Sequence, residues 1–294
     1  MANKFTAALL GFLLSSTAFP CSPDGATGFV PENDLYIPKN LKNRFGGLSE
    51  EQFNMAIDRV ESIYTQIVAD AGGKLIIERN WEDGTVNAYA QQSGKNWKVS
   101  MFGGLARHHT ITEDGMSLVV CHEIGHHVGG APKKIGWWGE GSSWASNEGQ
   151  ADYFATLKCL RKTFINDKNI EIVQKMNVPE IVKANCKKVT QNNSEDTAIC
   201  IRTSMAGKSV SDLFSELGKL PETKFDTPDP RIVARTDDNH PKAQCRLDTY
   251  YQGSLCDISM NEDVSQKDEV TGTCHSSTGY SQGVRPLCWF KPSK

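Results

Sequence analysis

The chain has 294 residues, enough for one sizeable domain with an extension or for two small domains. Hydrophobic residues make up 38% of it and charged residues 23%, the balance of a globular protein and not of a disordered one. The formal net charge of −3 excludes the strongly basic surface of a typical nucleic-acid-binding protein, so we expect no nucleic-acid partner.

Residues 1–18 have the pattern of a signal peptide. Lys4 supplies a positive charge, an apolar run covers residues 5–14, and small residues follow at 15–18. The run is too short for a stable membrane span, and no later stretch reaches the roughly 20 apolar residues that a span needs. The alternative is a buried N-terminal helix. We expect a mature chain without a transmembrane segment, located in the periplasm or secreted.

The cysteine content also favours an oxidising compartment, since there are nine cysteines and most lie after residue 150. No pair has the close C-x-x-C spacing of a structural zinc site, so disulfides are expected, with their connectivity open. Cys121 lies inside a predicted helix and is expected to be a small buried thiol. The eight others, Cys21 included, are then expected to form four bridges. Lipidation of Cys21 is the alternative, and Pro20 directly before it fits a lipoprotein signal badly.

Residues 19–48 are rich in Pro, Gly and Asn and predict an extended entry segment. Ser49 then begins a helix, with Gln52 three residues later completing a capping box. A core-facing stripe at helical spacing supports this helix, and Gly72-Gly73 ends it. The stripe consists of Phe53, Ile57, Val60, Tyr64 and Ile67.

Three short strands are predicted next, at residues 74–80, 86–91 and 97–103. Turn residues at 82–84 and 93–96 separate them. The short connections predict a small antiparallel sheet in the form of a meander.

A helix is predicted from about Glu113 to Val128, because Thr112 is a suitable N-cap and glycines and Pro132 follow the end. The next strong helix is predicted over about 147–164. Helical patterns at 170–184 and 210–217 are weaker.

A Pro- and Asp-rich loop then continues to about His240. Residues 251–294 are expected to form a loop-rich, disulfide-rich C-terminal extension, after a main domain that covers residues 49–250.

The central chemical signal is His122-Glu123-Ile124-Gly125-His126. On a helix, positions i and i+4 lie one above the other, so His122 and His126 can bind one metal ion. Glu123 is turned by about 100° from His122 and can act on a water at the metal without binding the metal itself. His127 points elsewhere on the helix and is expected at the surface.

Catalytic zinc usually takes three protein ligands, and the third is expected from a nearby element. Glu148 and Asp152 are again spaced i and i+4, so both carboxylates face one way. We assign Glu148 to the metal and Asp152 to the outer ring N–H of His122, which it would orient. Glu140 is a weaker rival ligand in a Gly-rich loop. The alternative for the pair is a solvated acidic helix face.

Four features of the sequence form a family pattern: Asn87-Ala88-Tyr89-Ala90 with Gly104-Leu105, the helix containing HEIGHH, Asn147-Glu148 with Ala151-Asp152, and His240-Pro241 with Arg246. On these residues the sequence resembles the HtpX-like and CaaX-prenyl-protease-like zinc metallopeptidases of the gluzincin group, over roughly residues 49–250. Many relatives carry transmembrane helices, so the chain is closer to the soluble members. The aromatic stretch Trp137–Gly141 is a departure, either a substrate-shaping flap or packing over a helix end.

The resemblance implies an α+β, zincin-like metallopeptidase core that binds one zinc ion. It implies that His240 helps to stabilise the oxyanion and that Arg246 organises the site through a carboxylate near the metal. It also implies that the strand at Asn87, Ala88 and Tyr89 pairs with an extended substrate.

These features together predict a zinc-dependent endopeptidase acting on protein or peptide substrates, with Glu123 as general base. One alternative is a non-catalytic zinc-binding chaperone or scaffold protein of the cell envelope. Another is an amidase or other zinc hydrolase acting on cell-wall material. A latent form, in which an N-terminal or tail segment covers the cleft, is a further alternative.

Overall fold

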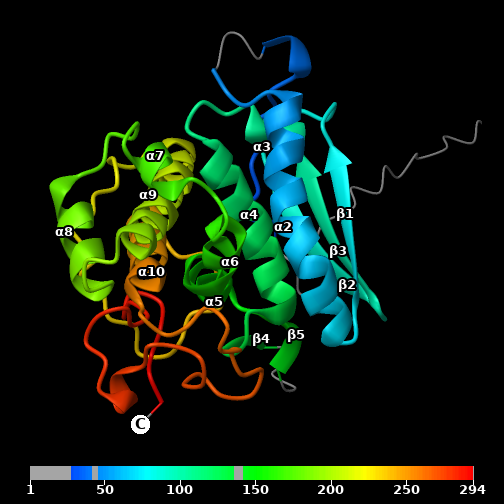
Figure 1. Ribbon diagram of the computed structural model, residues 1–294. Helices are drawn as coiled ribbons and strands as arrows, with labels where there is room; N and C mark the ends of the chain where they lie inside the picture. The colour runs from blue at the N-terminus through cyan, green and yellow to red at the C-terminus, as the bar shows by residue number, and fades with distance from the viewer. Residues whose placement is uncertain (1–27, 42–45, 136–141, 294) are drawn as a thin grey trace, which may run out of the picture.

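A computed structural model of the chain describes residues 28–41, 46–135 and 142–293. The predicted signal peptide, Cys21 and the stretch Trp137–Gly141 with Glu140 lie outside the described residues. The described chain is a mixed α+β protein with two small sheets. In Figure 1 the larger sheet forms one side, α2 and α4 pack beside it, and α9 and α10 lie on the far side of α4.

Helix α2 (Glu50–Asp70) confirms the predicted capping box, because the Ser49 hydroxyl accepts from the Gln52 N–H and the Gln52 side chain accepts from the Ser49 N–H. A short 3₁₀ turn, η1 (Lys39–Leu41), precedes it. The predicted stripe is buried except that Val68 replaces the partly exposed Ile67 in the core. This face packs on the sheet and on α4.

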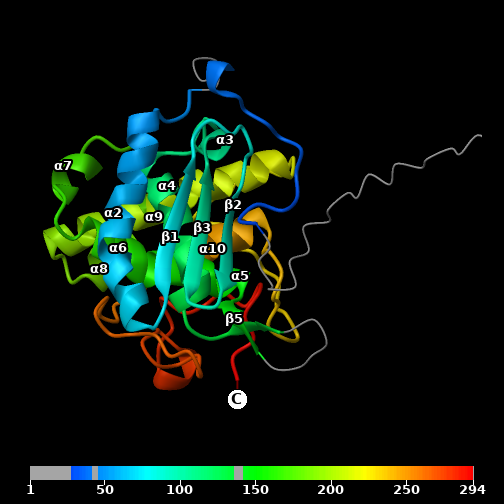
Figure 2. The ribbon, with the colours of Figure 1, turned by 90° about the vertical axis from the view of Figure 1, so that its right-hand side faces the viewer.

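The larger sheet is mixed, so the antiparallel meander was a wrong prediction. Its order is β1 (Lys74–Asn80), β3 (Asn96–Phe102), β2 (Ala88–Ser93), with β1 parallel and β2 antiparallel to the central β3. The tight turn at Gly94-Lys95 makes β2 and β3 a hairpin, whereas the longer connection at 81–87 carries the chain past β3 to the outer edge. Figure 2 shows this sheet face on, with β2 at one edge.

Helix α4 (Glu113–Val128) has the predicted bounds, and its N-cap Thr112 accepts from the Gly115 N–H. It follows the single turn α3 (Gly103–Ala106). After α4 the chain forms a two-stranded antiparallel sheet of β4 (Lys133–Ile135) and β5 (Ser142–Ser146), which the sequence pattern did not predict.

The predicted helix over 147–164 is continuous but not regular. It consists of α5 (Glu148–Phe154), a π-helical turn η2 (Ala155–Cys159) and α6 (Leu160–Phe164). Farther on, the weaker patterns correspond to α7 (Asn169–Val173), α8 (Glu180–Val189) and the long α9 (Ser194–Leu217).

Four disulfides are present, and they correct the expected role of Cys121. Cys121 is bonded to Cys159 with a Cα–Cα distance of 5.6 Å, so it is not a free thiol, and the four bridges form without Cys21. The bond ties α4 to the π-helical turn η2, because Cys121 lies on the face of α4 that meets that turn. The other three bridges are Cys186–Cys200, Cys245–Cys288 and Cys256–Cys274.

The C-terminal segment packs against the helices of the main domain. Helix α10 (Ala243–Leu255) runs through residue 250, where the sequence placed the domain boundary. The rest is irregular apart from η3 (Ser276–Thr278) and lies beneath α5 and α10 in Figure 1. A Cβ placed on Gly149 of α5 would lie 2.2 Å from the Trp289 ring, so this segment supports the start of α5. No helix in the described ranges is long and apolar enough to cross a membrane.

Candidate metal centre

Three side chains from α4 and α5 that could bind a metal ion converge in the interior. His122 and His126 lie one turn apart on α4, and Glu148 is the first residue of α5. Their candidate ligand atoms all lie within 4.8 Å of one another. Glu148 Oε2 is 3.3 Å from His122 Nε2, and Glu148 Oε1 is 3.8 Å from His126 Nε2. The structure therefore brings the three predicted ligands together.

The two imidazole rings are oriented through their Nδ1 atoms. His122 Nδ1 lies 2.7 Å from Asp152 Oδ1, and His126 Nδ1 lies 2.8 Å from the carbonyl oxygen of Ser146. Each Nδ1–H can donate to its acceptor, which turns the Nε2 lone pair toward Glu148. Neither Nε2 has a hydrogen-bond partner among the described residues, although both are buried. Two buried, unsatisfied imidazole nitrogens beside a carboxylate fit a transition-metal ion.

The sequence places the helices so that this convergence is possible. A Cβ on Gly125 would lie 3.2 Å from the Ala151 backbone, so glycine allows α4 and α5 to meet closely between the ligands. Asn147 caps α5 by accepting from the Gln150 N–H, which fixes the start of the helix directly before Glu148.

Glu123 is fully buried beside the ligands, and neither of its carboxylate oxygens has a hydrogen-bond partner among the described residues. Burial raises the pKa of Glu123 to about 8. A carboxyl group with this proton affinity can accept and release a proton near neutral pH.

Lys134 of β4 is a contact of the site that the sequence did not predict. Its Nζ lies 2.8 Å from Glu148 Oε1, and the residue is only 8% exposed. Burial alone would raise the pKa of Glu148, but Lys134, His240 and His126 hold it well below its usual range. Without a predicted β4, a lysine eight residues after His126 gives no signal in the sequence.

Asp152 is the centre of a buried polar network beneath the ligands. Its Oδ1 accepts from Arg246 Nη2 at 2.5 Å and from the Tyr250 hydroxyl at 2.6 Å, as well as contacting His122. Asp152 and Arg246 lie where the sequence and the resemblance expect them. Tyr250 was missed, and its spacing of four residues from Arg246 on one helix face is the signal that could have found it.

His240 adjoins the cluster and binds the entry segment. Its Nε2 lies 3.4 Å from Glu148 Oε2, and an Nε2–H can donate to the carbonyl oxygen of Gly28 at 2.7 Å. Burial lowers the pKa of His240. The next carbonyl oxygen of the segment, that of Phe29, accepts from Arg246 Nη1 at 3.1 Å.

The entry segment also occupies part of the predicted substrate-binding edge of β2. The Phe29 N–H donates to the Ala88 carbonyl oxygen at 2.9 Å. Asn87 accepts from the Val30 N–H at 2.9 Å and donates to the Val30 carbonyl at 3.1 Å. The Tyr89 backbone pairs with β3 opposite Ser100. Asn87 and Ala88 are therefore already paired with the chain itself.

His127 is not at the surface, contrary to the expectation. It is 5% exposed, and its ring stacks on Trp97 at 5.4 Å and on Trp144 at 4.8 Å between centroids. The neighbouring aromatic rings bury it, which a helix position alone does not reveal. It points away from the ligand cluster, and burial lowers its pKa to about 4.

Comparisons with protein-family models, with curated proteins and with solved structures found no significant match. The fold and the site define the chain as a disulfide-bonded α+β protein with a buried group of two histidines and a glutamate that can hold a metal ion.

Proposed function

We propose that the chain is a zinc-dependent endopeptidase with a zincin-like core. The proposal is carried by one observation, the convergence of two unsatisfied imidazole nitrogens and the Glu148 carboxylate beside the buried Glu123. Two imidazoles and one carboxylate are a common ligand set of catalytic zinc, with an open position for water or substrate. The motif spacing and the resemblance to gluzincins point the same way.

Bound zinc would supply Lewis acidity toward a peptide carbonyl and toward a water molecule. Glu123 accepts the proton of the attacking water and passes it to the leaving nitrogen. His240 offers an Nε2–H to the oxyanion, in the place where it now donates to Gly28.

An extended peptide would pair with the part of β2 beyond Ala88, where Gln92 is partly exposed and Ala90 is fully buried in this structure. Alternate residues of a strand direct their backbone groups to the same side, so Ala90 and Gln92 face away from β3 as Ala88 does. Backbone pairing at this edge would give affinity with little side-chain specificity, as expected for an enzyme that acts on varied proteins. We therefore propose that the substrate strand pairs at Gln92 and, once Ala90 is uncovered, at Ala90, and not at Asn87–Tyr89.

The four disulfides fit an oxidising compartment, and we propose the periplasm or the exterior of the cell as the location.

Glu148 is a proposed zinc ligand although Lys134 contacts it. A carboxylate has enough lone pairs to bind the ion through one oxygen and accept from the ammonium through the other.

A second candidate is a non-catalytic zinc protein that binds its partners without cutting them. The hydrogen bond between Gly28 and His240 favours it, because the residue proposed to stabilise the oxyanion is engaged by the chain itself. The pairing of Asn87 and Ala88 with the entry segment supports the same reading.

The test is zinc content and casein cleavage, measured side by side for the oxidised chain and its Glu123→Gln variant. Glu113→Gln is the matched control, because it makes the same change in the first turn of α4. Zinc in all three proteins, with cleavage only in the parent and the control, supports the peptidase. Undiminished cleavage by Glu123→Gln removes Glu123 from its role, and zinc without cleavage in any of them favours the second candidate.

A further inference from the structure

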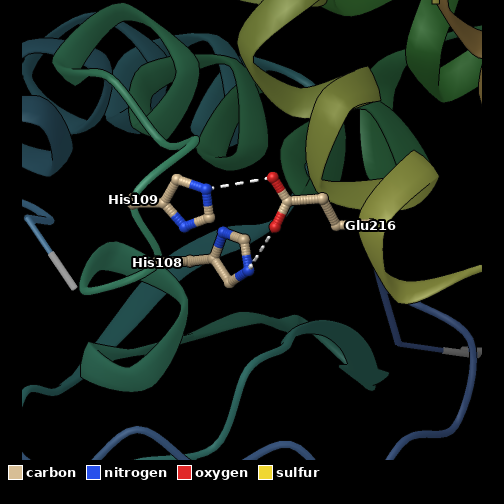
Figure 3. Close-up of side chains that lie close together, drawn as sticks. All are labelled: His108, His109 and Glu216. Carbon is tan, nitrogen blue, oxygen red and sulfur yellow. Dashed lines mark ion pairs between the residues drawn. The ribbon is translucent and has the colours of Figure 1, made fainter. Parts of the chain in front are cut away.

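Two adjacent histidines and a glutamate form a second cluster of side chains that could bind a metal. This cluster lies near the N-terminal end of α4, away from the first cluster of His122, His126 and Glu148. His108 and His109 follow α3, and Glu216 lies in the last turn of α9. His109 Nε2 is 3.0 Å from Glu216 Oε1, and His108 Nε2 is 3.7 Å from Glu216 Oε2 (Figure 3). About 14 Å of helix separates the first residue of α4 from His122, so the two clusters are distinct.

The candidate ligand atoms of this cluster lie close enough together for small side-chain movements to bring them onto one ion. Ligands bound tetrahedrally to zinc at about 2.0–2.1 Å lie about 3.3 Å from one another. The three candidate ligand atoms here lie within 4.8 Å, with both Nε2 atoms directed at the two oxygens of one carboxylate. The two rings stack at 4.8 Å with an interplanar angle of 25°, so their edges face the same way.

His108 is held in place through its other nitrogen. It is 6% exposed, and its Nδ1 lies 2.9 Å from the Thr110 hydroxyl. That hydroxyl can accept from Nδ1–H when Nε2 binds a metal, or donate to Nδ1 when Nε2 carries the proton. Metal ligation by His108 therefore needs the tautomer with the proton on Nδ1, which keeps the Thr110 hydroxyl as a partner but gives up the 3.4 Å contact from the Thr110 N–H to Nδ1. A polar partner on the outer nitrogen is the arrangement that orients histidine ligands in metal sites.

Helix α9 fixes both sides of the cluster. The Ser209 hydroxyl donates to the Thr110 carbonyl oxygen at 2.6 Å and accepts from the Thr112 N–H at 3.0 Å. Ser209 and Glu216 are seven residues apart, about two helical turns, and so share one face of α9. The loop that carries the histidines is thus anchored to the helix that carries the carboxylate.

An ion pair alone explains only half of this arrangement. A hydrogen bond from His109 Nε2–H to Glu216 would account for the 3.0 Å contact. His108 Nε2 lies 3.7 Å from the other carboxylate oxygen, too far for a hydrogen bond, so this second buried imidazole gains little from Glu216 alone and could give a lone pair to a metal.

We propose that His108, His109 and Glu216 bind a second divalent transition-metal ion, with zinc as the expected occupant. The ligand set is two imidazoles and one carboxylate, which suits zinc, nickel and copper more than calcium or magnesium. His109 and Glu216 are each about half exposed in their side chains, so the remaining position faces solvent. The ion would join the C-terminal turn of α9 to the segment that leads into α4.

The test counts zinc ions bound to the full oxidised chain by equilibrium dialysis at micromolar free zinc, followed by metal analysis. We expect two ions in the parent, one in the double variant His109→Ala with Glu216→Ala, one in His122→Ala with His126→Ala, and none when all four changes are combined. Glu222→Gln is the control, an exposed carboxylate beyond the end of α9 whose loss should leave two ions bound.

A second variant keeps the ligands and changes only the orienting group. Thr110→Val should leave the stoichiometry at two and weaken the second site by roughly 10–100-fold, the usual effect of losing an outer partner. The proposal is overturned if the double variant at His109 and Glu216 binds as much zinc as the parent. It is also overturned if the parent's only ion disappears with His122 and His126. Neither outcome depends on peptidase activity.

Discussion

The Asp152 carboxylate should contribute both to the stability of the fold and to metal affinity at the candidate site formed by His122, His126 and Glu148. Asp152 contacts His122, Arg246 and Tyr250 through one oxygen, and Asp152 and Arg246 are fully buried. Asp152→Asn keeps the size and an acceptor oxygen for His122 but removes the negative charge. Arg246 then remains as a buried cation without its carboxylate.

The expected loss in the free energy of unfolding follows from that unpaired charge. Breaking a buried ion pair by removing one partner costs about 3–5 kcal/mol. The Phe29 carbonyl and the rings of Phe29 and Phe214, at 4.7 and 4.0 Å from the Arg246 Cζ, would offset part of the cost, so we expect about 3 kcal/mol. Metal affinity at His122 should fall by roughly 10–100-fold, because the histidine loses the charge that strengthens it as a ligand.

Denaturant unfolding of the metal-free, oxidised proteins measures the first effect, and competition with a chelator measures the second. Asp70→Asn, at the exposed end of α2, is the control and should change stability by less than about 0.5 kcal/mol. Adding Arg246→Met to Asp152→Asn removes the unpaired cation, so the double variant should be more stable than Asp152→Asn alone. Strictly additive losses would refute the argument, because they would show that the two charges are not coupled.

Three further predictions concern parts of the fold around the site. Replacing Cys121 and Cys159 by Ala should cost about 4 kcal/mol in denaturant unfolding by the loop-entropy argument for a separation of 38 residues; an unchanged midpoint would contradict it. Asn87→Ala removes two hydrogen bonds to Val30 and should lower stability by about 1–3 kcal/mol, with faster proteolysis of the entry segment as the check. Burial raises the pKa of Asp248 from 3.8 to about 6, so the folded state holds its proton more tightly and this residue's contribution to stability should fall as pH rises through that window; Asp248→Asn should remove that contribution from the measured slope, and an unchanged slope would contradict it.

Local features of the sequence predicted the local parts of the site. The bounds of α4 follow from Thr112 and the glycines after Val128, because capping groups act within one turn. The i, i+4 spacing of His122 and His126, and of Glu148 and Asp152, is a property of the helix alone. Only the meeting of the two pairs needed tertiary structure.

The predictions that were wrong or missing concern contacts between residues distant in the sequence. The antiparallel expectation for β1 assumed that successive strands pair, whereas the connection at 81–87 let the chain cross to the far edge of the sheet. The Cys121–Cys159 bridge was missed because parity arguments count cysteines without locating them. Lys134 was missed because its contact with Glu148 depends on the β4–β5 sheet, which the sequence pattern did not predict.

The entry segment gives the strongest case of a local pattern that conceals a long-range role. Its Pro, Gly and Asn content correctly indicates extended backbone, but composition says nothing about where that backbone lies. Phe29 packs its ring 4.8 Å from His122, and its carbonyl accepts from Arg246, which is 217 residues away in the chain. Gly28 reaches His240 over a similar separation of 212 residues. The segment therefore links the proposed oxyanion donor to the residues beneath the metal ligands. It follows that changes at residues 28–30 should act on the site itself as well as on the stability of the fold.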